Sequence, residues 1–166
     1  LILPAFDYFV AGPDTVKMLN SFVLKSKYLY WQKRHEEAMS VLDSGIAAAT
    51  ACRDTYLMVS MLAEKANRHV YVDKDYKKAI EAHLRAIAIR EDEGLYYSLG
   101  IAMGLQGNDS ASYYMDRSIA LVEQKKDTAR LVHYLRNYAQ MLSYIGNDYE
   151  KAAVVSKRLR SLTPDG

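Results

Sequence analysis

The sequence predicts an all-α protein, a right-handed superhelix of about four helical hairpins with part of another hairpin in front. One observation is a pattern that occurs four times: polar turn residues, an alanine and, seven positions later, usually a small residue. A second observation is an Asp-Thr pair that stands 24 or 25 residues before three of these alanines. A two-helix unit that repeats with a period in the thirties to low forties is typical of a helical solenoid.

The recurring alanines are spaced by 41, 32 and 41 residues. With their partners seven positions on, the pairs are Ala38 and Gly45, Ala79 and Ala86, Ala111 and Ser118, and Ala152 and Leu159. The last pair departs from the rule because leucine is not small. Seven residues make about two turns of an α-helix, so both members of a pair share one face. We expect a neighbouring backbone to come close to these faces.

The Asp-Thr pairs mark helix starts. They are Asp14-Thr15, Asp54-Thr55 and Asp127-Thr128. An aspartate at this position accepts hydrogen bonds from backbone N–H groups that have no partner within the helix, and its charge suits the positive helix end. The sequence therefore predicts a helix that begins at each pair.

The predicted elements follow in chain order. The apolar stretch Leu1 to Val10 predicts the second helix of a truncated preceding repeat, which a turn at 11–14 ends. Helix pairs are then predicted at 15–31 and 34–50, 54–71 and 75–91, 94–106 and 109–124, and 127–145 and 148–162. No linker divides the chain, so we predict one domain over 1–166. Its parts are a partial repeat at 1–12 and repeats at 13–52, 53–92, 93–126 and 127–164.

Three glycines of the third repeat have predicted structural roles. Gly100 and Gly104 share one face of a helix and predict close packing of a neighbour. Gly107 follows that helix and predicts its end, because glycine adopts the left-handed conformation that terminates helices.

Composition excludes several classes of function. With 22 basic and 20 acidic side chains, the chain gives no electrostatic reason to expect a nucleic-acid partner. No stretch reaches the roughly 18 apolar residues of a membrane span. The single cysteine, Cys52, predicts a small hydrophobe that is buried or half-buried at a helix end. The chain begins at Leu1, in mid-pattern, so we expect it to be part of a longer protein, and its compartment is not assigned.

No catalytic, metal or cofactor site is predicted. The four histidines lie in four different predicted helices, without the spacing of a metal motif. His83 stands at a position where we expect core or edge packing. No serine or aspartate has the setting of an activated nucleophile. We therefore do not expect an enzyme.

These features resemble tetratricopeptide (TPR) repeats over nearly the whole chain. The third repeat supplies Leu99-Gly100, Gly107-Asn108, Ala111 and Ser118; the second supplies Asp75-Tyr76, Ala79 and Ala86; the fourth supplies Asp148-Tyr149, Ala152 and Pro164. The first repeat matches least, keeping Ala38 and Gly45 but carrying Lys25-Ser26 near the usual Leu-Gly. The two spacings of 41 depart from the family's 34-residue period, which implies longer helices.

The resemblance implies a concave groove, lined by the first helix of each repeat, that takes a peptide or a partner helix. Laid on this chain, it nominates twelve residues that combine apolar surface with polar groups. They are Asn20, Lys27, Tyr30, Glu64, Arg68, Tyr71, Tyr97, Ile101, Tyr134, Asn137, Met141 and Tyr144. Packing between helices is the alternative role for many of the tyrosines.

The function implied is a protein- or peptide-binding scaffold, as the sensory or docking region of a larger bacterial regulatory protein. One alternative is a peptide-pheromone sensor that switches an attached DNA-binding domain. Another is a structural module that forms a homodimer through its terminal helices, using an apolar patch of Ile2, Leu3, Phe6 and Phe9.

Overall fold

The computed structural model describes residues 15–146 and 148–163, and these residues form helices joined by short turns. The α-helices are α2 (Thr15–Trp31), α3 (His35–Ala51), α4 (Thr55–Arg68), α5 (Tyr76–Ile89), α6 (Glu93–Gln106), α7 (Ala111–Gln124), α8 (Thr128–Tyr144) and α9 (Tyr149–Leu162). A π-helix, η1 (His69–Asp73), directly continues α4. Within the described ranges, no helix has the length and apolar character needed to cross a membrane.

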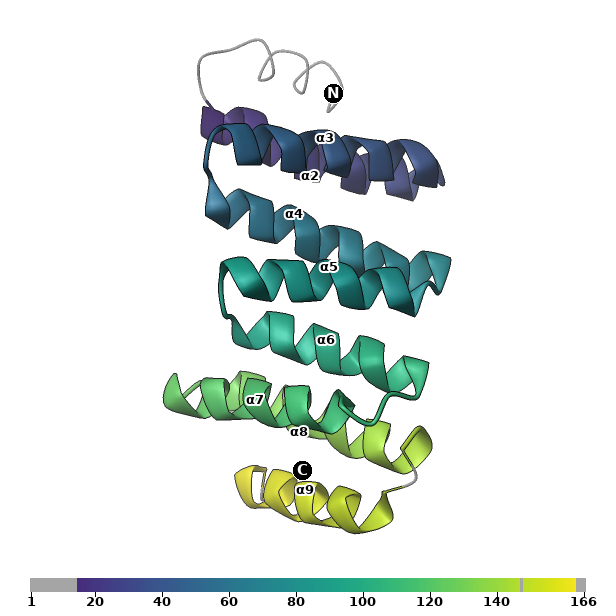
Figure 1. The fold of residues 1–166 in the computed structure, drawn as a ribbon. Helices are drawn as coiled ribbons and strands as arrows, with labels where there is room; N and C mark the ends of the chain where they lie inside the picture. The colour runs from purple at the N-terminus through teal and green to yellow at the C-terminus, as the bar shows by residue number, and fades with distance from the viewer. Residues whose placement is uncertain (1–14, 147, 164–166) are drawn as a thin grey trace.

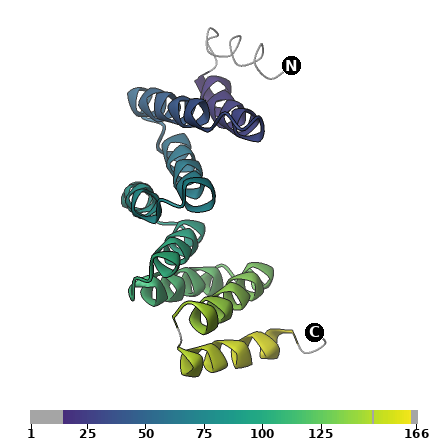
Figure 2. The same ribbon diagram turned by 90° about the vertical axis from the view of Figure 1, so that its right-hand side faces the viewer.

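The helices stack in antiparallel pairs along one axis (Figure 1). The pairs are α2–α3, α4–α5, α6–α7 and α8–α9, and each pair packs on the next. We call the first helix of each pair helix A and the second helix B. Figure 2 shows the pairs from one end of their helices, as a zigzag column. This confirms the predicted all-α solenoid of four hairpins. The predicted partial repeat at 1–12 lies outside the described residues.

The core is divided along the stack rather than gathered in one centre. Phe22, Leu42 and Met61 form part of a cluster that joins α2, α3 and α4. Leu99 and Tyr138 belong to a larger cluster that joins α6 to α9. Each cluster involves neighbouring helices only, as expected for a repeat array whose units contact their neighbours.

The small residues predicted to permit close packing are buried. Ala38, Ala79 and Ala111 are at most 5% exposed, and Ala86 is fully buried. Gly45 leaves no room for a side chain, because a Cβ atom there would lie 2.6 Å from Met61 Sδ. These positions therefore need small residues because neighbouring helices occupy the space.

Glycines of α6 have the same role. A Cβ on Gly100 would lie 2.8 Å from the Met115 side chain, and one on Gly104 would lie 2.6 Å from Met141 Sδ. Gly107 has a φ of 77° and ends the helix in the left-handed conformation, as predicted.

Aspartates begin most of the described helices. Asp54 accepts a hydrogen bond from the backbone N–H of Leu57, and Asp127 accepts one from Arg130, as predicted. Asp75 and Asp148 cap α5 and α9 in the same way. The predicted cap at Asp14 lies outside the described residues.

Basic residues end several helices in the left-handed conformation. Lys33, Arg53, Lys74 and Lys126 have φ between 55° and 63°. In three of these turns the next residue is the capping aspartate of the following helix. A basic residue suits this position because the negative end of a helix favours a cation nearby. A turn of two or three residues thus stops one helix and starts another.

Differences in helix length explain the uneven period. Helix A of the third pair, α6, has 14 residues, whereas α8 has 17 and α4 is lengthened by the five residues of η1. The predicted helix at 54–71 therefore ends as an α-helix at Arg68 and continues as a π-helix. The prediction for Cys52 was wrong, because its side chain is exposed in the turn after α3.

Candidate functional site

All twelve residues nominated for binding lie on helices A or on η1. We call the exposed surface of these elements the A face. The structure gathers ten of the twelve into three neighbouring groups, described in turn below. Whether any of them contacts a ligand stays a prediction.

The first group is an ion-pair cluster between α2 and α4. Lys27 Nζ lies 4.0 Å from a carboxylate oxygen of Glu64, and Arg68 pairs with the same carboxylate. The Arg68 guanidinium carbon also lies 3.6 Å from the centre of the Tyr30 ring, a cation–π contact. The side chains of Glu64 and Arg68 are 16% and 15% exposed. These contacts hold two charged groups in fixed positions at the edge of the A face.

A small recess adjoins this cluster. Tyr30, His35, Arg68 and Asp73 line it, together with the apolar residues Ala38, Met39 and Val72. The Tyr30 and His35 rings lie 5.0 Å apart, and Arg68 Nε and His35 Nδ1 are buried without a hydrogen-bond partner among the described residues. Its volume is about 10 Å³, too small for an organic ligand.

The second group is a stack of aromatic rings between α6 and α8. The rings of Tyr97 and Tyr134 lie 4.1 Å apart and nearly parallel, at 8°. His133 lies 5.7 Å from the Tyr97 ring, and Asn137 is within hydrogen-bond distance of His133. Burial raises the pKa of Tyr134 to about 12 and also raises the pKa of Tyr97. Both phenols therefore stay protonated at neutral pH.

The third group lines an apolar hollow of about 220 Å³ between α6 and α8. Four of the nominated residues line it, namely Ile101, Asn137, Met141 and Tyr144. Leu105, Gln140 and Ile145 complete the lining, and the sequence reasoning had missed these three. Leu105 lies four residues after Ile101, so helical spacing from that residue was the signal that could have found it.

Two nominated residues belong to none of these groups. Asn20 is exposed on α2, and Tyr71 is 63% exposed on η1. The sequence reasoning also missed Leu24 and Trp31, which are 58% and 82% exposed on the Asn20 side of α2. Leu24 and Trp31 follow Asn20 by four and eleven residues, and this helical spacing was the signal that could have placed them on the same face.

A buried carboxylate outside the A face was also missed. Glu93 is 2% exposed and pairs with both Lys125 and Arg130. Burial opposes ionisation of Glu93, but the hydrogen bond from Lys125 and the charge of Arg130 outweigh it and lower the pKa. The Glu93 backbone carbonyl accepts a hydrogen bond from Ser118. The residue thus ties the start of α6 to α7 and α8.

The residues that could bind a metal do not gather. Within the described parts of the chain, no three His, Cys, Asp or Glu side chains are arranged to hold an ion. His83 is fully buried in α5, which confirms its predicted core position. Neither nitrogen of its ring has a hydrogen-bond partner in the described structure, and burial lowers its pKa to about 4.

This stack of paired helices defines a helical-repeat solenoid of the TPR-like class. The chain is similar to the crystal structure of nearly identical TPR-like repeats from a predicted kinesin light chain of Podospora anserina. The TM-score is 0.75, and the likeness covers 98% of this chain and 87% of that one. Sequence identity is 11%, so the likeness concerns the fold alone. No protein-family model matches the sequence, and no curated protein matches it either.

Proposed function

We propose that this protein is a scaffold that binds a protein or peptide on its A face, as the docking region of a larger regulatory protein. A TPR-like fold suggests a protein-interaction scaffold. The proposal that the protein is part of a larger regulatory protein rests on the family resemblance. The sequence of the full-length gene tests it by showing which domains are attached.

The observation that carries the proposal is a row of exposed apolar side chains. The last turn of each helix A, or of the π-helix that continues it, carries one: Trp31, Tyr71, Leu105 and Tyr144, which are 82%, 63%, 40% and 84% exposed. Helices A all end on the same side of the stack, the right-hand side of Figure 1 that faces the viewer in Figure 2. The four residues therefore follow one edge of the A face.

This arrangement suits recognition for two reasons. Aromatic side chains offer a large apolar surface and lose little conformational freedom on binding, which is why they are enriched at binding hot spots. A solenoid also presents its surface largely preformed, so a partner gains contacts without refolding of the array.

A pull-down from a native lysate tests the proposal. The variant Trp31→Ala/Tyr71→Ala removes half of the row, and both side chains are exposed, so we expect it to fold. We expect the partner captured by the unmodified protein to be lost. The matched control is Tyr113→Ala/Tyr149→Ala, which removes two exposed aromatic side chains from helices B.

Far-ultraviolet circular dichroism verifies that both variants keep their helicity. Capture that survives in the A-face variant, or that is lost equally in the control, contradicts the assignment. Light scattering on the pure protein distinguishes the alternative of self-association. The residues named for that alternative, Ile2, Leu3, Phe6 and Phe9, lie outside the described residues.

A further inference from the structure

Two hollows adjoin at the C-terminal ends of α6 and α8. The first is the apolar hollow described above, about 220 Å³ in volume. The second is about 330 Å³ and lies between the α6–α7 and α8–α9 turns. Met141 and Ile145 line both, so the two hollows share a wall. A single bound segment could therefore occupy both.

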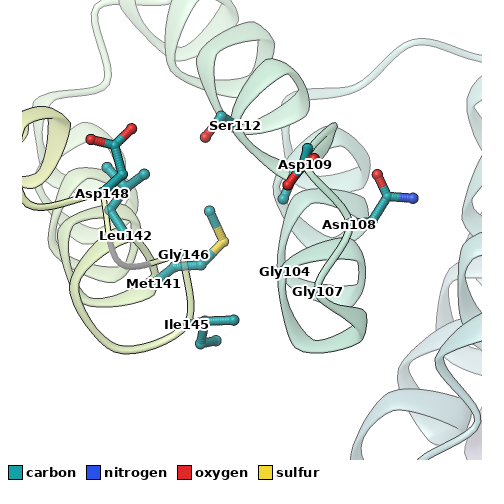
Figure 3. Close-up of a pocket in the computed structure, with 11 residues that line it drawn as sticks. Gly104, Gly107, Asn108, Asp109, Ser112, Met141, Leu142, Ile145, Gly146 and Asp148 are labelled. Atoms are coloured by element: carbon teal, nitrogen blue, oxygen red, sulfur yellow. The ribbon is translucent and has the colours of Figure 1, made fainter.

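Glycines at the turns line the second hollow. Gly104 and Gly107 form one wall, and no atom lies within 4 Å of the position that a Cβ on Gly107 would take. Figure 3 shows Met141 extending from α8 toward this wall, with Ile145 beside it. The opposite end of the hollow is polar and includes Ser112.

The charge of the second hollow is negative. Asp109 and Asp148 come from different repeats and lie on opposite walls in Figure 3. One oxygen of Asp148 accepts the hydrogen bond that caps α9, which leaves the other oxygen for a ligand. No lysine or arginine is among the described residues that line either hollow. The C-terminal ends of α6 and α8 and the N-terminal ends of α7 and α9 all meet here, so the partial charges of the helix ends offset one another and the two aspartates set the sign.

We propose that this double hollow binds a protein segment through an apolar side chain and a neighbouring lysine or arginine. The apolar side chain enters between Leu105 and Tyr144, and the cation lies between the two aspartates. The proposal deepens the proposed function and rests on it, because it names the chemistry of the partner where the A face meets the α6–α7 and α8–α9 turns. Charge complementarity favours a basic partner over an acidic one. A carboxylate of the partner would face the carboxylates of Asp109 and Asp148, with no basic side chain in the lining to offset them.

The test begins with selection of random dodecapeptides, displayed on phage, against the unmodified protein. We expect enrichment of peptides in which a lysine or arginine lies within a few residues of a leucine or an aromatic residue. The probes are then fluorescently labelled synthetic copies of the enriched peptides, whose Kd is measured by fluorescence anisotropy.

Two variants separate the two hollows. Asp109→Asn/Asp148→Asn removes both charges and keeps the cap of α9, because asparagine at position 148 caps a helix as well as aspartate does. We expect this variant to weaken binding by at least about tenfold and to lower its dependence on salt. Tyr144→Ala should weaken binding of the same peptides through the apolar hollow. The matched control, Asp54→Asn/Asp75→Asn, removes two charges at capping positions elsewhere and should leave Kd unchanged.

Each other outcome overturns the proposal. Enriched peptides without a basic residue, no enrichment at all, or an equal Kd for the charge variant and the control would show that the double hollow does not select a cation. Binding that depends on Trp31 and Tyr71 but not on the two aspartates would leave the proposed function standing without this inference. A dimer that dissociates when the two aspartates are substituted would assign the hollow to a second copy of the chain.

Discussion

Acidification should destabilise this protein through His83. The side chain is fully buried in α5, and neither ring nitrogen has a hydrogen-bond partner in the described structure. Burial disfavours the charged imidazolium and lowers the pKa of His83 from 6.5 to about 4. The folded state therefore holds the ring neutral at a pH at which the unfolded chain binds a proton.

The magnitude follows from the two pKa values. Stability rises with pH wherever the unfolded state binds more protons, which for His83 is between about pH 4 and pH 6.5. Above pH 6.5 the contribution is fully present, and as the pH falls it is lost at about 1.4 kcal/mol per pH unit. We expect a loss of about 2 kcal/mol at pH 5 and about 3 kcal/mol below pH 4.

Urea unfolding of the unmodified protein and of His83→Phe at several pH values measures this contribution. The difference in free energy of unfolding between the two proteins cancels other titrating groups, and the packing cost of phenylalanine is the same at each pH. We expect this difference to shift by about 2 kcal/mol in favour of the variant between pH 8 and pH 5. A difference that stays constant over this range would refute the reasoning, because His83 would then bind its proton equally well in both states.

Three further predictions concern packing and turns, each measured as the free energy of unfolding in urea. Glu93→Gln should lose about 1–2 kcal/mol because it removes a buried carboxylate from two basic partners, and an unchanged stability would contradict the role of the ion pairs. Gly45→Val should lose about 3 kcal/mol because its side chain would overlap Phe22 and Met61, and a loss below about 0.5 kcal/mol would contradict the close approach. Gly107→Ala should lower the free energy of unfolding by about 1 kcal/mol, and Lys126→Gly should raise it by up to about that amount, because both positions have a positive φ that glycine adopts most easily. Equal effects of the two variants in the same direction would exclude this backbone explanation.

Much of the fold could be predicted because its signals are local. The helix at 15–31 was predicted at its observed bounds, and the other described helices within three residues at either end. Asp54 and Asp127 mark helix starts through a hydrogen bond to a residue three positions away. Ala79 and Ala86 mark a packing face through the period of the helix itself. Each signal depends only on residues that are close in sequence, so it can be recognised from the sequence alone.

The π-helix and the exposure of Cys52 could not be predicted in the same way. Propensity and periodicity do not distinguish the last turns of α4 from the π-helix that follows, because both continue the helical pattern. The exposure of Cys52 depends on how the turn after α3 packs against the rest of the stack, and the sequence pattern does not show that packing.

The candidate site was predicted as a face but not as groups. Helical spacing indicated that Tyr97 and Ile101 lie on one side of α6. It could not show that Tyr97 stacks on Tyr134, or that Tyr144 closes an apolar hollow with Leu105, since those contacts join helices some forty residues apart. Ligand contact by the nominated residues stays a prediction, which the experiments above test.

The sequence by itself determined the helices, their pairing and the small residues at their crossings, because hydrogen-bonded turns and helical periodicity are properties of short segments. Only the tertiary structure decided that Glu93 is buried between two cations and that Asp109 and Asp148 face one hollow. These arrangements depend on the offset of one repeat from the next. The packed side chains of several helices set that offset together, and no single segment encodes it.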